Sequence, residues 1–194
     1  MLIKSGVELT DAFSITNQKL RQAVDDHKSS FRFFTLSTID DGEKRPQNRM
    51  VVLRSFSENW TFECFTDARS QKVDQIRDCP STGVLFWDPV DQVQVRIQAE
   101  AIIHHSDSLA SDRWERVKGS ARKAYTQTVI PGRAVEDPAA AHSWPETLTD
   151  EHFAVLSFRA IKVNVLQLNG LEHLAFRFTR LSGESDWSGD WIAP

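Results

Sequence analysis

Closely spaced strand patterns constrain the fold of this chain more than any other feature. Turn residues separate several apolar, β-branched and aromatic runs, most clearly at Asp40-Asp41-Gly42, which is a strong hairpin signal. Few helical patterns lie between the runs, so the sequence predicts an α+β domain built on an antiparallel barrel of six or seven strands. The predicted strands are 31–40, 45–56, 60–66, 81–87, 93–105, 152–169 and 173–183.

Helical patterns are few and short. Apolar residues recur at helical spacing near the start of the chain, which predicts an N-terminal helical segment, 1–30. Residues 131–150 contain three prolines and no usable periodicity, so they are predicted to form a long loop. Such a loop suits a functional or oligomer-contact role, and a mobile surface loop is the alternative. The predicted helices are 9–27, a short helix capped by Ser70 and ending before Pro80, and 106–119, which 121–128 continues.

Length and composition narrow the organisation and the location of the protein. A chain of 194 residues suits one domain, so we expect a single domain over 1–194, with 185–194 as a short tail. No continuous apolar run resembles a signal peptide or approaches the length needed to cross a bilayer, so the expected location is the cytoplasm, without a membrane partner. Cys64 and Cys79 show no CxxC or zinc-type spacing and are interpreted as reduced, structural thiols.

Charge and aromatic content indicate which partners to expect. A net charge of −4, spread over both signs, argues against a basic nucleic-acid-binding face, although a barrel module stacking single-stranded nucleic acid on its aromatics is a rival interpretation. Twelve Phe and six Trp can fill a β-rich core or stack on a planar ligand. The histidines lack metal-ligand spacing, and no metal is expected.

The segment FTDARSQK, 65–72, carries the strongest chemical signal. The hydroxyls of Thr66 and Ser70, the ammonium of Lys72 and the free N–H groups of a helix start can surround an anion. Charge-assisted hydrogen bonds of this kind suit a phosphate ester. Arg49 and Arg54 lie five positions apart, so a regular strand would direct them to opposite faces. The alternative is that Ser70 only caps a helix and the cations are solvated.

Four motifs in order, RMVVLR, FTDARSQK, STGVLFW and QVRIQAEA, resemble the pyridoxamine 5′-phosphate oxidase family of FMN-binding split barrels. The resemblance runs from about Phe31 to Ala101 and resumes weakly near the C-terminus. It implies a split barrel, FMN as cofactor and a homodimer whose two subunits share each flavin. The implied FMN contacts are Arg49, Val51, Val52, Arg54, Phe65, Thr66, Ser70, Gln71, Lys72 and Gln94, with Arg177 and Gln127 from the partner chain.

Departures from the family pattern concern mainly the substrate side. Gln71 stands where the oxidases usually have Arg, and Arg54 stands where they have Lys. The flavin-side tryptophan and the RLH-like substrate triplet are missing, which indicates the oxidase-like branch rather than the vitamin B6 oxidase itself. The candidate substrate residues are Arg54, Lys118, Arg122 and His173.

Hydride transfer between a small, anionic substrate and flavin is the function that the resemblance implies, because flavin supplies the redox chemistry and the protein supplies orientation. No acid or base catalyst is assigned, since binding geometry is expected to dominate. A non-catalytic FMN-binding protein is the first alternative. A split barrel that uses another planar cofactor, such as haem or a deazaflavin, is the second.

Overall fold

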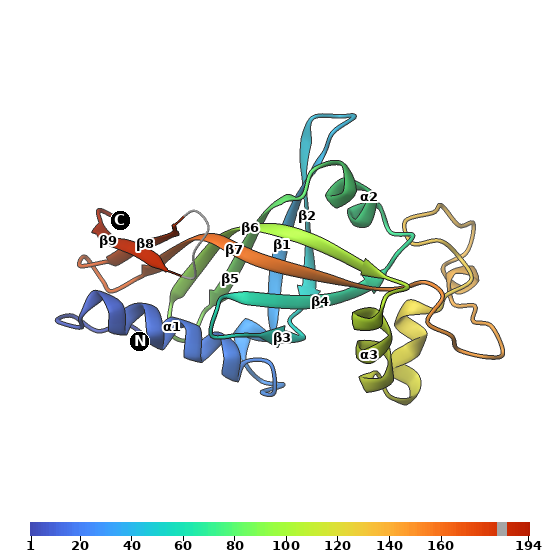
Figure 1. Ribbon diagram of the computed structural model, residues 1–194, viewed down its shortest axis with the longest axis horizontal. Coiled ribbons are helices and arrows are strands. Elements are labelled where there is room, and N and C mark those ends of the chain that lie inside the picture. The colour runs from blue at the N-terminus through green and yellow to red at the C-terminus, as the bar shows by residue number, and fades with distance from the viewer. Residues whose placement is uncertain (182–185) are drawn as a thin grey trace.

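A nine-stranded antiparallel sheet forms the body of the molecule. The computed structural model describes residues 1–181 and 186–194, and Figure 1 shows the arrangement of its elements. The helices are α1 (Leu9–Gln22), α2 (Gln71–Asp78) and α3 (Ser108–Arg116), with short 3₁₀ helices η1 (Ser30–Arg32), η2 (Gly119–Tyr125) and η3 (Pro138–Ala141). The strands are β1 (Phe33–Asp40), β2 (Arg45–Val52), β3 (Ser55–Phe56), β4 (Thr61–Asp67), β5 (Ser81–Asp88), β6 (Val93–His105), β7 (Phe153–Gln167), β8 (Leu174–Arg180) and β9 (Trp187–Ile192).

The sheet closes into a barrel because its two ends are consecutive segments of the chain. The strand order is β2-β1-β5-β6-β7-β4-β3, and only Leu53 and Arg54 separate β2 from β3. Both linking residues stay in the backbone network, since Leu53 N–H donates to Arg32 O and Arg54 N–H donates to Glu63 O. One bent segment therefore joins both edges of the ladder, an arrangement that leaves fewer unpaired strand edges.

Aromatic side chains fill the barrel, as the composition allows. Phe34, Phe62, Phe86 and Phe158 are fully or almost fully buried and pack edge-to-face or stacked on one another. α1 lies beside β3 and β9 and contributes Ala12 and Leu20 to the same core. These four phenylalanines therefore fill the core, which is one of the two roles that the sequence allows for the aromatic residues.

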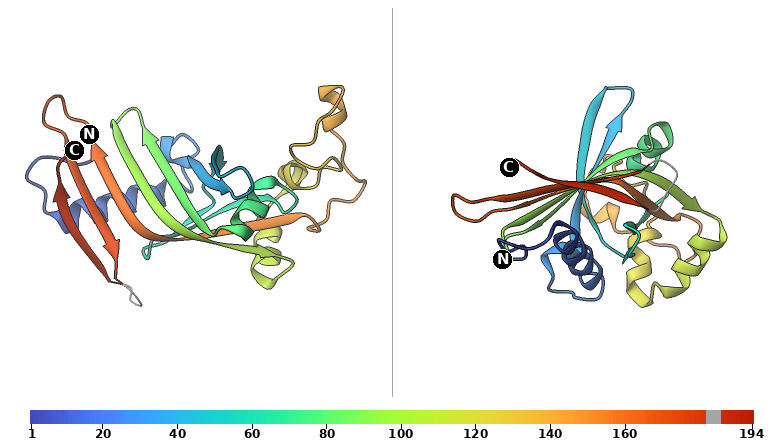
Figure 2. Two further views of the ribbon diagram at one scale, coloured as in Figure 1. Left: turned by 90° about the horizontal axis from the view of Figure 1, so that it is seen from above. Right: turned by 60° about the vertical axis from the view of Figure 1, so that its left-hand side comes forward.

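A second, smaller core covers the outer face of β4 and β7. Trp114 of α3 and Tyr125 of η2 pack there with Phe153 and Val155. By contrast, β8 pairs with β7 and β9 pairs with β8 at the other end of the molecule, away from α3 (Figures 1 and 2). The outer face of β1, β2 and β5 remains open and carries the exposed side chains Phe33, Ile39, Met50 and Trp87.

The α+β antiparallel barrel predicted from the sequence is confirmed, with differences at particular elements. Within the described residues, nine strands replace the predicted six or seven, because Leu53 and Arg54 interrupt 45–56 and because the predicted tail contains β9. The end of the predicted strand 173–183 and the start of the tail at 185 lie outside the described residues. Among the described residues, no helix is long and apolar enough to cross a membrane.

Helix ends differ more from the predictions than strand ends do. The first helix stops at Gln22, and the helix predicted over 106–119 ends at Arg116. Val117 leaves helical geometry at ψ 115°, and Gly119 adopts a left-handed φ of 55°, which glycine tolerates without strain. The predicted continuation is therefore wrong as an α-helix, and a separate 3₁₀ helix, η2, takes its place.

Candidate functional site

A compact cluster of two hydroxyls and an ammonium lies where β4 passes into α2. Lys72 Nζ lies 3.0 Å from both Thr66 Oγ1 and Ser70 Oγ, and the two hydroxyl oxygens are 3.1 Å apart. Thr66 and Ser70 are buried and Lys72 is half-buried. The structure thus brings together the three side chains that the FTDARSQK segment singles out.

Ser70 occupies the N-cap position of α2, as predicted, but its side chain does not cap the helix. Its Oγ donates to Asp67 O at 2.7 Å and contacts Lys72, and no cap hydrogen bond forms within α2. The first N–H groups of a helix have no intrahelical acceptor. Helix capping by the Ser70 hydroxyl is therefore a wrong prediction, because the hydroxyl takes part in the cation cluster.

Arg49 lies on β2 beside α2, and its acceptors among the described residues are all neutral. Its guanidinium donates to Thr38 Oγ1, to Gln75 Oε1 at 3.0 Å and to the backbone oxygens of Gln47 at 3.0 Å and Leu36 at 3.4 Å. These bonds fix the direction of the side chain without neutralising its charge. Arg49 therefore presents a fixed positive charge near α2.

The electrostatics of this region favour a bound anion. Neither Arg49 nor Lys72 has an ion-pair partner within residues 1–181 and 186–194. Burial is the main cause that lowers the pKa of Lys72, and the Arg49 charge lowers it further. Burial likewise lowers the pKa of Arg49. Two half-buried cations that repel each other are stabilised by an anionic ligand.

Arg54 faces a different element from Arg49. Its Nη2 donates to the Tyr125 hydroxyl at 3.2 Å, and its guanidinium carbon lies 5.5 Å from the Phe65 ring centre. The Nε of Arg54 is buried and has no hydrogen-bond partner among the described residues. A buried donor of this kind is costly to leave unpaired, so Arg54 is a second group with unused capacity for an anion.

Several predicted flavin contacts lie away from this cluster within one chain. Val51 packs against the main core, whereas Val52 faces outward on β2. Thr66, which contacts Lys72, pairs with Ala154 of β7, whereas Gln94 pairs with Leu166, twelve residues further along the same strand. At about 3.3 Å per residue, that separation is roughly 40 Å along β7. The structure does not bring Gln94 to Lys72 of the same chain.

Other predicted residues are engaged in local contacts. Gln71 is exposed and its Nε2 points to Asp40 Oδ2 at 3.4 Å. Gln127 lines a cavity of about 300 Å³ together with Arg69, which donates to its backbone oxygen. His173 Nδ1 accepts from Asn169 N–H, and Arg177 forms an ion pair with Asp190 at 3.1 Å.

The two substrate-side cations of the α3–η2 segment contact backbone oxygens. Lys118 Nζ donates to Glu115 O. Arg122 Nε donates to Val117 O at 2.8 Å, and its guanidinium stacks 4.6 Å from the Trp114 ring centre. Arg54 and Arg122 both contact the second core, through Tyr125 and Trp114, whereas His173 directly precedes β8 at the other end of the molecule.

Three residues of the site were not singled out from the sequence. Thr38, Gln75 and Tyr125 contact Arg49 or Arg54 through hydrogen bonds. Thr38 and Gln75 look like ordinary residues of a strand and of a short helix, so nothing in the sequence distinguished them. Tyr125 carried a usable signal, because it is the only Tyr of the chain beside twelve Phe.

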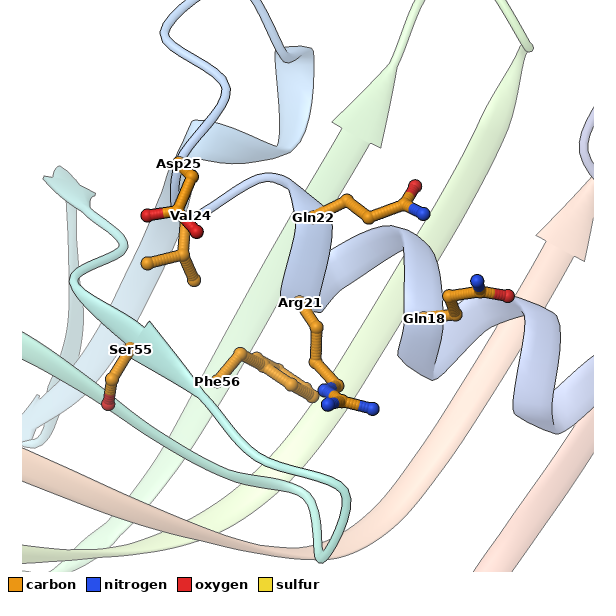
Figure 3. Close-up of a pocket in the computed structure, with 7 residues that line it drawn as sticks. All are labelled: Gln18, Arg21, Gln22, Val24, Asp25, Ser55 and Phe56. Atoms are coloured by element: carbon orange, nitrogen blue, oxygen red, sulfur yellow. The ribbon is translucent and has the colours of Figure 1, made fainter.

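Two cavities lie apart from the cation cluster. A cavity of about 500 Å³ lies between α1 and β3, where Arg21 extends toward Phe56 (Figure 3), and none of the predicted site residues line it. A second cavity, of about 460 Å³, lies on the open outer face and is lined by Thr38, Ile39 and Gly83. The Thr38 side chain points to the opposite, buried face of β1, where it bonds Arg49, so the strand lies between this hollow and Arg49.

The fold is a split barrel, and its cluster of hydroxyls and cations is a candidate site for a phosphate ester. Hydroxyls, helix N–H groups and uncompensated cations are the donors that such an ester requires. Residues 15–105 match the family model described as pyridoxamine 5′-phosphate oxidase, FMN-binding domain. Residues 15–105 are therefore similar to the FMN-binding domain of this family. The match confirms the resemblance carried by the four motifs, and it confirms FMN as the cofactor.

Curated relatives share part of their length with this chain. It is 34% identical over 105 residues to pyridoxine/pyridoxamine 5′-phosphate oxidase 1, chloroplastic, from Arabidopsis thaliana, covering 52% of this chain and 19% of that protein. It is 33% identical over 88 residues to the pyridoxine/pyridoxamine 5′-phosphate oxidase of Microcystis aeruginosa, covering 45% of this chain and 40% of that protein. The chain thus spans less than half the length of either relative.

Solved structures share the fold over nearly the whole chain. A pyridoxamine 5′-phosphate oxidase-related, FMN-binding protein from Nostoc punctiforme superposes with a TM-score of 0.75 at 23% identity, covering 98% of this chain and all of that one. PhzG from Burkholderia lata 383, in complex with tetrahydrophenazine-1-carboxylic acid, gives a TM-score of 0.73 at 13% identity, covering 94% and 92%. At these identities the likeness establishes the fold.

Proposed function

We propose that this protein is an FMN-dependent oxidoreductase that transfers a hydride between a small, anionic substrate and the flavin. The observation that carries the proposal is the cluster of Thr66, Ser70 and Lys72 beside the uncompensated Arg49. These groups would bind the phosphate of FMN through charge-assisted hydrogen bonds. Bound FMN supplies the redox chemistry, and this chain supplies position and charge.

A homodimer completes the site in this proposal. Arg177 of β8 and His173, which directly precedes β8, lie at the β8–β9 end of the molecule, away from α2 (Figure 1), and Gln94 lies at the start of β6. A second copy bound to the open outer face would bring such residues to the cluster. The exposed Phe33, Met50 and Trp87 support this, because contiguous exposed apolar side chains mark interaction surfaces.

The substrate side of the site supports two versions of the function. Arg54 would hold an anionic group of the substrate, since its Nε is buried without a partner among the described residues. A non-catalytic FMN-binding protein is the second candidate, because Lys118 and Arg122 bind backbone oxygens of their own segment. Turnover separates the two candidates, whereas FMN binding is common to both.

The experiment is to denature the purified protein and identify the released chromophore by absorbance and mass. We expect FMN at close to one molecule per chain. Substitution of Ser70 and Lys72 by Ala should lower the FMN affinity by at least about tenfold, since hydrogen bonds to charged groups contribute roughly 1.5–3 kcal/mol each. A chain that neither carries FMN nor binds it when added would overturn the proposal.

Anaerobic reduction assays then test catalysis. The FMN-loaded protein is mixed with phosphorylated amines, including pyridoxamine 5′-phosphate, and flavin bleaching is followed by absorbance. Bleaching that Arg54→Ala slows without releasing FMN supports an oxidoreductase with an anionic substrate. Stable FMN binding with no bleaching by any donor supports the non-catalytic candidate.

A further inference from the structure

A single amide stands between Arg49 and the nearest carboxylate in its hydrogen-bond network. Gln75 of α2 is 4% exposed, and its Oε1 accepts from Arg49 Nη2 at 3.0 Å and from Thr38 Oγ1. Its Nε2 donates to Asp40 Oδ2 at 3.3 Å. The order Arg49, Gln75, Asp40 therefore places one neutral group between a cation and an anion.

A neutral amide can make both of these contacts without a change in charge. A guanidinium has donors only, and an ionised carboxylate has acceptors only. Gln75 presents its oxygen to the Arg49 guanidinium and its nitrogen to the Asp40 carboxylate. Each charged group thus has a hydrogen-bond partner while the two charges remain apart. A carboxylate in direct contact with Arg49 would neutralise it and would compete with any other anion for its donors.

We propose that Gln75 is a positioning residue that directs Arg49 and keeps its charge available for the phosphate of FMN. The inference rests on the proposed FMN site and names a residue for which nothing in the sequence pattern indicated a role in binding. Thr38 belongs to the same arrangement, because it accepts from Arg49 and donates to Gln75. Asp40 accepts from the Glu43 N–H at 3.0 Å as well, which fixes the carboxylate independently of Gln75.

The decisive variant is the double substitution Asp40→Asn with Gln75→Glu. It moves the negative charge one step toward Arg49 and leaves the net charge of the protein unchanged. The amide introduced at position 40 can still accept from the Glu43 N–H and can donate to the carboxylate introduced at position 75. The FMN-free variant should thus be as stable as the wild type or more stable, because the hydrogen bond between the Arg49 cation and a neutral amide becomes an ion pair.

FMN affinity should change in the opposite direction. We expect the FMN dissociation constant, measured by quenching of flavin fluorescence on the FMN-stripped full chain, to rise by at least about tenfold, since an anion placed beside another anion is strongly disfavoured. Asp40→Asn alone is the matched control. It removes the carboxylate, keeps Gln75, and should bind FMN at least as tightly as the wild type.

Two results would overturn the inference. One is a double variant that binds FMN as tightly as the wild type. The other is a double variant whose FMN affinity and thermal stability fall together, which would assign Gln75 a purely structural role. If the wild type itself binds no FMN, the proposed function fails. The role of Gln75 is then tested separately, by the protection that inorganic pyrophosphate gives against thermal unfolding. Equal protection of the wild type and the double variant would contradict the proposed role of Gln75.

Discussion

Lys72 shows how one residue can favour ligand binding at a cost to stability. Its ammonium is half-buried, donates to two hydroxyls and lies near the Arg49 charge. Burial lowers its pKa below that of an unfolded lysine. A lysine with a depressed folded pKa adds stability as pH rises through that pKa toward the unfolded value. The FMN-free chain should gain stability from this group over that alkaline window.

Lys72→Met tests this balance directly. At neutral pH the FMN-free variant should unfold at a higher temperature than the wild type, and it should lack the alkaline gain attributed to Lys72. Its FMN dissociation constant should rise by about tenfold or more, because a charge-assisted hydrogen bond is lost. Thermal melts from neutral to alkaline pH, with FMN titrations, measure both effects. Lys28→Met, at an exposed position, is the control and should change neither the melting temperature nor the FMN affinity. A Lys72→Met chain that is less stable than the wild type would contradict the prediction.

Cys64 and Cys79 should differ sharply in reactivity. Burial is the main cause that raises the pKa of Cys64 to about 12, so its thiolate is scarce at mildly alkaline pH. Cys79 is half-buried at the end of α2. A thiol reagent should therefore label one cysteine of the native chain quickly and the second only after unfolding. Rapid labelling of both in the native chain, read by mass spectrometry, would show that the interior near Lys72 opens readily.

Sequence reasoning at the residue scale found the groups that carry charge and missed those that direct them. Thr66, Ser70 and Lys72 were predicted from their chemistry, and they meet in space. Gln75 was missed, because its role depends on which strand α2 packs against, and a glutamine on a short helix looks like any surface residue. Positioning residues depend on tertiary contacts, so local patterns do not reveal them.

At the scale of elements, β9 depends on a close approach between two strands. Gly189 pairs with Phe178 of β8, and a Cβ at this glycine would lie 2.6 Å from the Phe178 ring. Phe178 is buried and stacks on Phe13 of α1 with ring centres 3.9 Å apart. The ring therefore has little freedom to move, and Gly189 couples β9 to the packing of α1.

Gly189→Ala should destabilise the protein by about 1–3 kcal/mol, the usual cost of overpacking. Urea unfolding followed by tryptophan fluorescence measures the change, since Trp187 contacts Phe13 at a ring distance of 5.2 Å. Gly42→Ala is the matched control, because its added Cβ would meet nothing closer than 3.5 Å. If the two variants are equally stable, the ring of Phe178 must be able to shift freely.

Element types were easier to predict than element ends. β6 occupies the predicted 93–105, because turn residues precede it and its polar and apolar residues alternate over much of its length. The strand β9 was missed, since SDWSGDWIAP is short and its pairing with β8 is a tertiary contact. The α3–η2 break was missed because a left-handed Gly119 is one of many glycine conformations that the sequence allows.

At the scale of the whole molecule, the open outer face is the main unexplained surface. Met50 is 62% exposed, and Phe33 and Trp87 are 48% and 42% exposed on neighbouring strands. Val52 and Gln94 face the same side of the sheet by their register. The apolar side chains and two predicted FMN contacts therefore share one surface, which is expected if a second copy covers it and both copies line the flavin.

Met50→Glu tests the dimer and the shared flavin together. A glutamate at this exposed position should leave the monomer stable, but it would bury an unpaired charge in the dimer, so dimer affinity should fall by at least about 100-fold. Sedimentation velocity measures the dimer, and released FMN per chain measures the cofactor. We expect the dimer affinity and the FMN content to fall together, because Gln94 and Arg177 would no longer come from a partner.

Val90→Glu, at an 84% exposed turn position, is the control and should change neither the dimer affinity nor the FMN content. A Met50→Glu chain that becomes monomeric and keeps its FMN would show that one subunit holds the flavin alone, and one that stays dimeric would place the interface elsewhere.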